Sequence, residues 1–120
     1  MKELKQTVSE SNLEMKEAFK VMKSNDSISA KEFLGNVFKI KGYVIVDTEL
    51  TILETGEVEK GKSICFLTET DEIVGSNSNS LLKTFEEIKD TFGEEYVSLD
   101  VKITKGTSKN GKTFLSLELA

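Results

Sequence analysis

The chain of 120 residues has no histidine, tryptophan, proline or arginine, and it has a single cysteine, Cys65. Without histidine, neither a Ser–His or Cys–His nucleophile nor a histidine-ligated metal site can be built. One cysteine cannot form an intramolecular disulfide, which is typical of a cytosolic protein. Because all sixteen basic residues are lysine, an anion-binding site would use point charges rather than bidentate guanidinium groups. This composition favours non-specific phosphate contact over base readout.

Long apolar runs are also missing. No stretch of eighteen apolar residues exists that could span a membrane. The first nineteen residues mix both charge signs and contain no apolar core of a secretion signal. We therefore expect no membrane partner and a cytoplasmic protein.

Negative charge dominates the chain, with a formal net charge of −5. Such a balance argues against a polyanionic partner unless the positive charges are gathered in one place. The last twenty residues are that place, because they hold four lysines and one acidic residue. An anion would dock there.

Residues 1–26 are predicted to form a helical leader, separate from a folded domain over residues 27–120. Ser11 and Glu14 form a capping-box pattern. Met15, Phe19 and Met22 then share one helical stripe. The leader could pack on the domain, lie free, or associate with a second copy, since methionine or valine recurs every seven residues at 1, 8, 15 and 22.

The rest of the chain alternates as strands do, interrupted by one helix. Residues 37–53 read as a long strand bent at Gly42, followed by strands near 58–68 and 72–75. A helix is expected after the N-cap Ser80, with an apolar stripe from Leu81 to Phe92 and a stop at Gly93. Strands near 97–103 and 113–119 form a final hairpin. This β-β-β-α-β-β order predicts a mainly β protein, a five-stranded OB-fold barrel with an N-terminal helical extension.

A phosphate-loop pattern occurs at Gly56–Ser63, GEVEKGKS. Its mechanism needs a helix directly after the lysine, so that amide groups meet phosphate. The following residues, ICFLT, have strand composition, and Glu57 and Glu59 would repel phosphate. We interpret the pattern as a hairpin turn, which makes a nucleotide hydrolase the weakest hypothesis.

Exposed rings among lysines form the candidate binding surface. In the long strand the buried parity is assigned to Phe38, Ile40, Val44 and Val46, which places Tyr43 outside. Phe114 takes the outer parity of the last strand. Rings stack on bases while lysines follow phosphates, as single-strand binding requires. The candidate nucleic-acid-binding residues are Lys39, Lys41, Tyr43, Lys102, Lys105, Lys109, Lys112 and Phe114.

Each of these features has a simpler interpretation. Tyr43 and Phe114 could cover apolar surface beneath the leader helix, and a turn rich in Lys, Gly and Asn needs no function. The polar loop Gly75–Ser80 could be only a helix cap, or it could contact phosphate through its amide and hydroxyl groups.

Several short motifs resemble those of small single-stranded DNA-binding proteins from phages and mobile elements of Gram-positive bacteria. They are Phe33–Asn36, Lys41–Ile45, Gly75–Ser78 and Thr107–Lys112, the last followed by Leu115. The resemblance covers about residues 30–120. It implies an OB fold that coats DNA in a bacterial host cell during replication or recombination, with no cofactor. The acidic helix and the absence of arginine depart from the pattern.

These observations predict a sequence-non-specific single-stranded DNA-binding protein that is not an enzyme. No metal, cofactor or small-molecule substrate is expected, and a homo-oligomer remains open. The alternative is an OB-fold protein–protein interaction module that does not bind nucleic acid, since a fold does not set a function.

Overall fold

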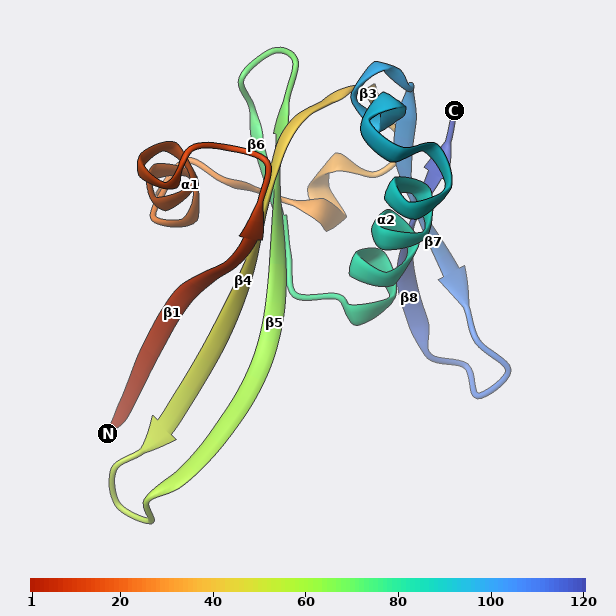
Figure 1. Ribbon diagram of the computed structural model, residues 1–120. Helices are drawn as coiled ribbons and strands as arrows, with labels where there is room; N and C mark the ends of the chain where they lie inside the picture. Colours follow the sequence, from red (N-terminus) through yellow and green to blue (C-terminus); the bar gives the residue numbers. More distant parts are fainter.

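Two β-sheets with a helix packed between them make up the protein, as the computed structural model of residues 1–120 shows (Figure 1). The larger sheet has the strand order β1-β4-β5-β6-β2, and the smaller one has the order β3-β7-β8. The strands are β1 (Lys2–Ser11), β2 (Ile28–Ser29), β3 (Val37–Phe38), β4 (Ile40–Ile52), β5 (Glu57–Thr68), β6 (Ile73–Ser76), β7 (Val101–Thr107) and β8 (Thr113–Leu119). The helices are α1 (Met15–Met22) and α2 (Asn79–Phe92), with 3-10 turns η1 (Ala30–Phe33) and η2 (Gly93–Ser98). The mainly β prediction is confirmed, but the two sheets are not closed into a barrel.

The amino-terminal residues are where the prediction is wrong. Residues 2–11 form a strand, not part of a helical leader, and pair antiparallel with β4 from Lys2↔Ile52 to Ser11↔Val44. The helical part is limited to α1. Ser11 does not cap it, because the Ser11 hydroxyl donates to the Tyr43 carbonyl and accepts the Leu13 amide. Residues 2–11 are therefore built into the larger sheet, and α1 packs on that sheet through Ala18 and Val21.

A bulge in β4 reverses the predicted side of its residues. The pairing of β4 with β5 is irregular between Ile40 and Gly42, and one extra residue turns every later side chain to the opposite face. Tyr43 and Ile45 consequently join the main core, whereas Val44 and Val46 pack under α1 with Ala18 and Val21. The position of Gly42 also admits Leu13, since a β-carbon at 42 would lie 2.5 Å from a Leu13 methyl group.

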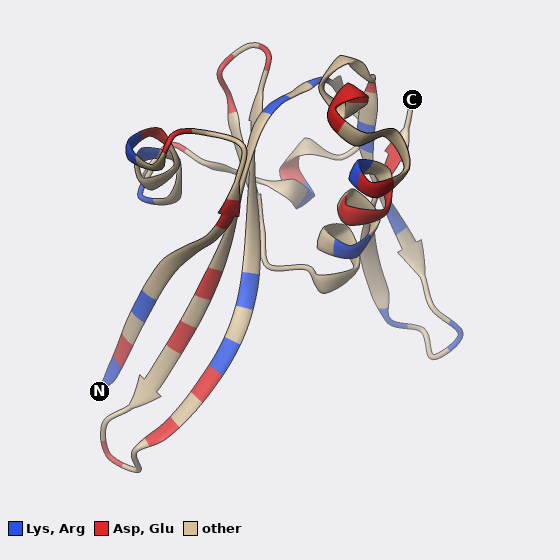
Figure 2. Ribbon diagram, in the orientation of Figure 1, with Lys and Arg blue, Asp and Glu red and all other residues tan.

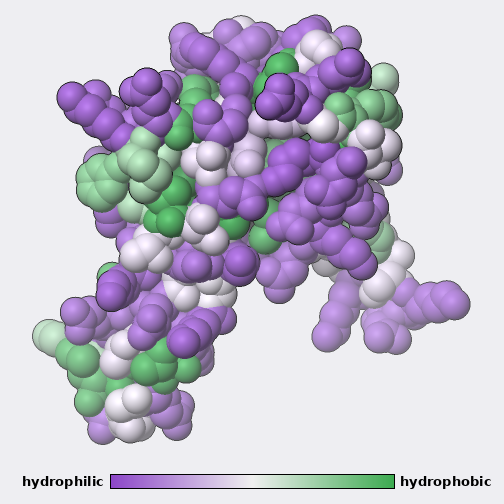
Figure 3. All heavy atoms as spheres, in the orientation of Figure 1, coloured by the Kyte–Doolittle hydropathy of each residue, from purple (hydrophilic) through white to green (hydrophobic).

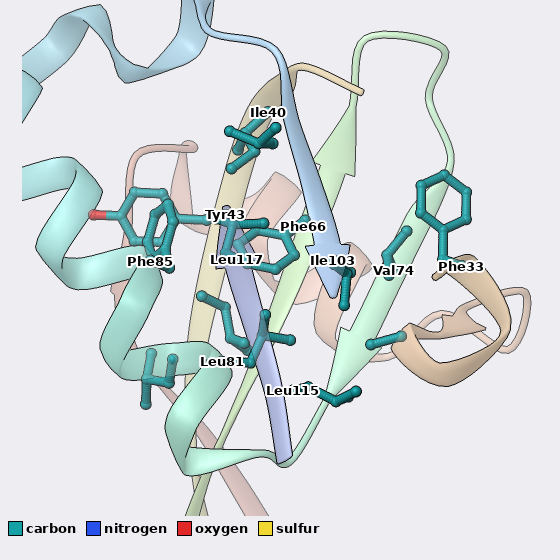
Figure 4. Packing of buried hydrophobic residues seen from close by; sticks show 14 of the residues in the cluster. Phe33, Ile40, Tyr43, Phe66, Val74, Leu81, Phe85, Ile103, Leu115 and Leu117 are labelled. Atoms are coloured by element: carbon teal, nitrogen blue, oxygen red, sulfur yellow. The ribbon is translucent and has the colours of Figure 1, made fainter. Parts of the chain in front are cut away.

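The main core lies between the two sheets around α2 (Figure 4). Phe85 of α2 contacts Phe66 of β5 edge-on, with ring centroids 5.3 Å apart. Thr84 ties the helix to the smaller sheet, because its hydroxyl accepts the Leu117 amide at 2.8 Å. The helix begins after Ser78, whose hydroxyl accepts the Leu81 amide, and ends at Gly93 with φ +60°. The predicted helix and its glycine stop are confirmed, with the cap two residues earlier than expected.

The structure also tests the predicted final hairpin and the phosphate-loop pattern. β7 pairs with β8 from Val101↔Leu119 to Thr107↔Thr113, while residues 93–98 form the turn η2 instead of the start of a strand. Residues 57–68 are strand β5, so no helix follows the phosphate-loop lysine Lys62. The pattern is not itself the expected hairpin turn, because the turn occupies residues 53–56 and only Gly56 of the pattern belongs to it. No helix is long and apolar enough to cross a membrane.

Candidate functional site

The predicted site residues fall into three separate parts of the molecule. Lys39 immediately precedes β4 and Lys41 is its second residue. Figure 1 shows the start of β4 at the top and the β7–β8 hairpin at the lower right. Tyr43 lies in neither place. The hairpin alone keeps several of the predicted residues together, namely Lys105, Lys109, Lys112 and Phe114, whereas Lys102 lies at its other end, opposite Val37 and Glu118.

Tyr43 is buried, which overturns its assignment as a stacking residue. Only 6% of it is exposed, and its ring centroid lies 4.9 Å from that of Phe85 and 6.1 Å from that of Tyr96. The β4 bulge is the physical reason, because it turns position 43 inward. A base could reach this ring only if α2 left the core.

The Tyr43 hydroxyl belongs to a polar cluster at the edge of the core. It donates to the Glu10 carboxylate at 2.7 Å, and the Lys89 ammonium group donates to both Glu10 and the Tyr43 oxygen. Hydrogen bonds from Lys89 and Tyr43 lower the pKa of Glu10. Burial raises the pKa of Tyr43 and raises that of Tyr96 to about 12. The cluster links β1, β4 and α2 through hydrogen bonds and one ion pair.

Lys39 and Lys41 are neutralised by neighbouring carboxylates. The Lys39 ammonium group lies 2.6 Å from Asp100, and that of Lys41 lies 2.8 Å from Asp71. The hydrogen bond to the carboxylate raises the pKa of each lysine. A phosphate would have to displace an existing partner there, so these two lysines are weaker candidates than those of the hairpin.

The loop end of the hairpin carries positive charge without an acidic residue of its own. Residues 101–117 contain four lysines and no Asp or Glu, and none of these lysines is in an ion pair. Figure 2 shows blue segments and no red one in the loop and the adjoining strand halves. Lys102 stands apart from the rest, because it is half-buried and opposite Glu118. Lys105, Lys109 and Lys112 are exposed.

Phe114 has an unusually close neighbour. Its cross-strand partner is Gly106, and a β-carbon at position 106 would lie 2.5 Å from the ring. The ring therefore lies against the β7 backbone and remains 39% exposed. The exposure of the ring agrees with the outward position predicted from the strand parity, and its contact with Gly106 holds an aromatic surface in place before any ligand arrives.

A groove of about 760 Å³ opens beside the ring, and we call it the hairpin groove. It lies between η1, the β6–α2 loop and the hairpin. Its lining contains no carboxylate and consists of Ser29, Ala30, Lys31, Leu34, Gly75, Ser76, Asn77, Ser78, Lys105, Thr113, Phe114 and Leu115. The groove thus combines an aromatic ring, an exposed aliphatic side chain, two lysines and a loop of hydroxyl and amide groups.

Two of these residues, Lys31 and Leu34, were not recognised in the sequence. They lie more than seventy positions before the groove residue Lys105, and only the tertiary structure brings them together. Of the predicted polar loop Gly75–Ser80, residues 75–78 line the groove, although Gly75 and Ser76 belong to β6 and residues 79–80 begin α2. Ser78 also caps α2, because its hydroxyl accepts the Leu81 amide.

A second hollow, of about 590 Å³, follows the long strands β1, β4 and β5. It contains Lys5, Lys60 and Lys62, but Asp47 and Glu49 lie between them. The carboxylates cancel the positive potential that a polyanion needs. This hollow is a weaker candidate than the hairpin groove.

The structure contains no group of three or more His, Cys, Asp or Glu residues arranged to hold a metal ion. No protein-family model, curated protein or solved structure matches the chain.

Proposed function

We propose that this protein binds single-stranded DNA through the hairpin groove, without sequence specificity and without chemistry on the DNA. The observation that carries the proposal is the Phe114 ring, held half-exposed on Gly106 in a groove with two lysines and no carboxylate. A base of any identity can stack on such a ring, while lysines on flexible stems neutralise the flanking phosphates.

The arrangement of strands supports a partly open OB fold as the framework. In chain order β4, β5, β6, α2, β7 and β8 follow the OB sequence of three strands, a helix and two strands. The β3–β4 segment acts as one bent strand, because β3 pairs with β7 and β4 pairs with β5. In OB folds the loop between the last two strands borders the oligonucleotide groove. The equivalent loop here is the lysine-rich hairpin beside Phe114.

The resemblance to phage and mobile-element proteins supports a biological role. Under this proposal the protein coats single-stranded DNA during replication or recombination of phage or plasmid DNA in a bacterial cytoplasm. The same groove can serve every sequence it meets, because neither ring stacking nor phosphate contact reads a base edge.

A fluorescence-anisotropy titration with labelled oligo-dT at two salt concentrations tests the proposal. Phe114→Ala should weaken binding by about 5- to 150-fold, the equivalent of ~1–3 kcal/mol for one stacked base. Phe19→Ala is the matched control, because the Phe19 ring is 55% exposed on α1, outside the groove. An equal effect of the two substitutions, or none from either, would refute the role of the groove. Failure of the wild type to bind at low salt would favour the protein-interaction module.

A further inference from the structure

Three strands project from the body of the protein as an arm with no helix over it. The arm comprises residues 2–7 of β1, 47–52 of β4 and 57–62 of β5, at the lower left of Figure 1. β6 pairs only with Ile64–Leu67 of β5. Both outer strands of the arm therefore have an unpaired backbone edge.

The two faces of the arm differ in chemistry. On the face toward α2, charges alternate across the strands, with Glu49 between Lys5 and Lys60. On the opposite face, which is the α1 side, Leu4 stands directly opposite Leu50, with Ile52 one step further out. Leu4 is 59% exposed. Figure 3 shows hydrophobic side chains gathered on the arm, outside the body.

An exposed strand edge next to an exposed apolar face invites pairing with another strand. The β1 edge is regular over residues 2–7, because its bulge lies further on, between Val8 and Glu10. It contains no proline. Beyond the bulge, Glu10 is already bound to Tyr43 and Lys89. The free segment available to a partner is thus Lys2–Thr7.

The charges of this segment are complementary to themselves in one antiparallel register. When two β1 strands cross at Leu4, Glu3 of each copy faces Lys5 of the other, and the two Leu4 side chains meet. A register shifted to cross at Lys5 would oppose two like charges. The free edge of β5 lacks this property, since crossing at Glu59 or at Lys60 also opposes like charges.

We propose that two copies of this chain associate by antiparallel pairing of their β1 edges, centred on Leu4. The three strands of each arm then form one continuous sheet, and the two Leu4–Leu50–Ile52 surfaces merge on one face. The bodies lie at opposite ends, because the paired strands run in opposite directions. Both hairpin grooves stay open, since the hairpin is remote from β1 (Figure 1). This inference does not depend on DNA binding.

Sedimentation-equilibrium centrifugation of the full chain over a range of concentrations tests the interface. The wild type should approach twice its mass of 13.4 kDa. Leu4→Glu places two carboxylates at the crossing point and should yield a monomer. Val58→Glu is the matched control, because Val58 is 46% exposed on the other face of the same arm and should leave the dimer intact. Circular dichroism confirms that each variant is folded.

A charge exchange tests the register. Glu3→Lys should raise the dimer dissociation constant by about tenfold, because it places a positive charge opposite Lys5 at both symmetric positions of the interface. Adding Lys5→Glu to that variant should restore part of the loss. A wild type that stays monomeric, a dimer indifferent to Leu4→Glu, or a dimer equally lost with Val58→Glu would overturn the proposal. Oligo-dT affinity per chain should be unchanged in Leu4→Glu, which separates this interface from the proposed function.

Discussion

Phe114 lies so close to Gly106 that a β-carbon at position 106 would come within 2.5 Å of the aromatic ring. The two residues are cross-strand partners in the β7–β8 hairpin. The glycine therefore determines where the ring sits, and the ring in turn covers the glycine backbone. This contact connects the packing of the hairpin to the shape of the hairpin groove.

Gly106→Ala should weaken DNA binding although it changes no charge and removes no ring. The new methyl group must displace the ring, because no real β-carbon contacts a neighbour at 2.5 Å. We expect a loss of affinity for oligo-dT comparable to that of Phe114→Ala. Gly61→Ala is the control, because a β-carbon there would meet only the Thr48 hydroxyl, at 3.1 Å, away from the groove. Unchanged affinity in Gly106→Ala would show that the position of the ring does not matter.

Each lysine that contacts phosphate should contribute to the salt dependence of the DNA-binding constant. Lys105→Gln and Lys31→Gln should each reduce the slope of log K against log salt by about 0.7, the value for one phosphate contact with a single strand. Lys41→Gln should leave the slope unchanged, because Lys41 is already paired with Asp71. Titrations at several salt concentrations give the slopes. A change in slope confined to Lys41→Gln would move the phosphate path to the start of β4.

Tyr43 should matter for stability and not for DNA binding. Tyr43→Ala removes a buried aromatic side chain, and we expect a loss of about 3–5 kcal/mol in the free energy of unfolding. Tyr43→Phe removes only the hydroxyl that donates to Glu10 and should cost about 0.5–1.5 kcal/mol. Urea unfolding measures both values. The folded Tyr43→Phe variant should bind oligo-dT like the wild type, and a clear loss would return this residue to the binding surface.

Glu10 and the buried Tyr96 should make the free energy of unfolding depend on pH at the acid and the alkaline end of the scale, respectively. Hydrogen bonds from Lys89 and Tyr43 lower the pKa of Glu10 below 4.5 in the folded state, so its contribution is complete above that pH and is lost as the pH falls. Burial raises the pKa of Tyr96 from 10.0 to about 12, so its contribution is lost as the pH rises through that range. Unfolding free energies measured against pH should show both losses. In Glu10→Gln the acid-side loss should be smaller.

The ionisation of Tyr43 and Tyr96 can be measured directly, because they are the only tyrosines in the chain and both are buried in the main core. Because the pKa of each tyrosine is raised in the folded protein, their ultraviolet tyrosinate absorbance should appear at higher pH in the folded protein than in urea, where it should appear near pH 10. An identical titration in both conditions would contradict the buried arrangement.

Local patterns were sufficient for the elements whose partners are close in sequence. The apolar stripe from Leu81 to Phe92 and the glycine after it predicted α2, and the alternation of Leu115 and Leu117 predicted that Phe114 faces outward. The strand composition after Lys62 was enough to reject a phosphate loop. In each case one buried face sets the spacing of apolar residues along the chain, so this spacing is enough to predict the element.

Only the tertiary structure decided the rest. Residues 2–11 are a strand because β4 extends beyond the body and offers them an edge to pair with, which no local pattern in β1 reveals. Tyr43 is inside because the bulge between Ile40 and Gly42 reverses the faces of β4, and alternation cannot register one extra residue. The hairpin groove exists because chain folding sets η1 beside Lys105 and Phe114, which follow it by more than seventy residues. The amino-acid order sets which segments can form, whereas long-range pairing sets which faces they bury.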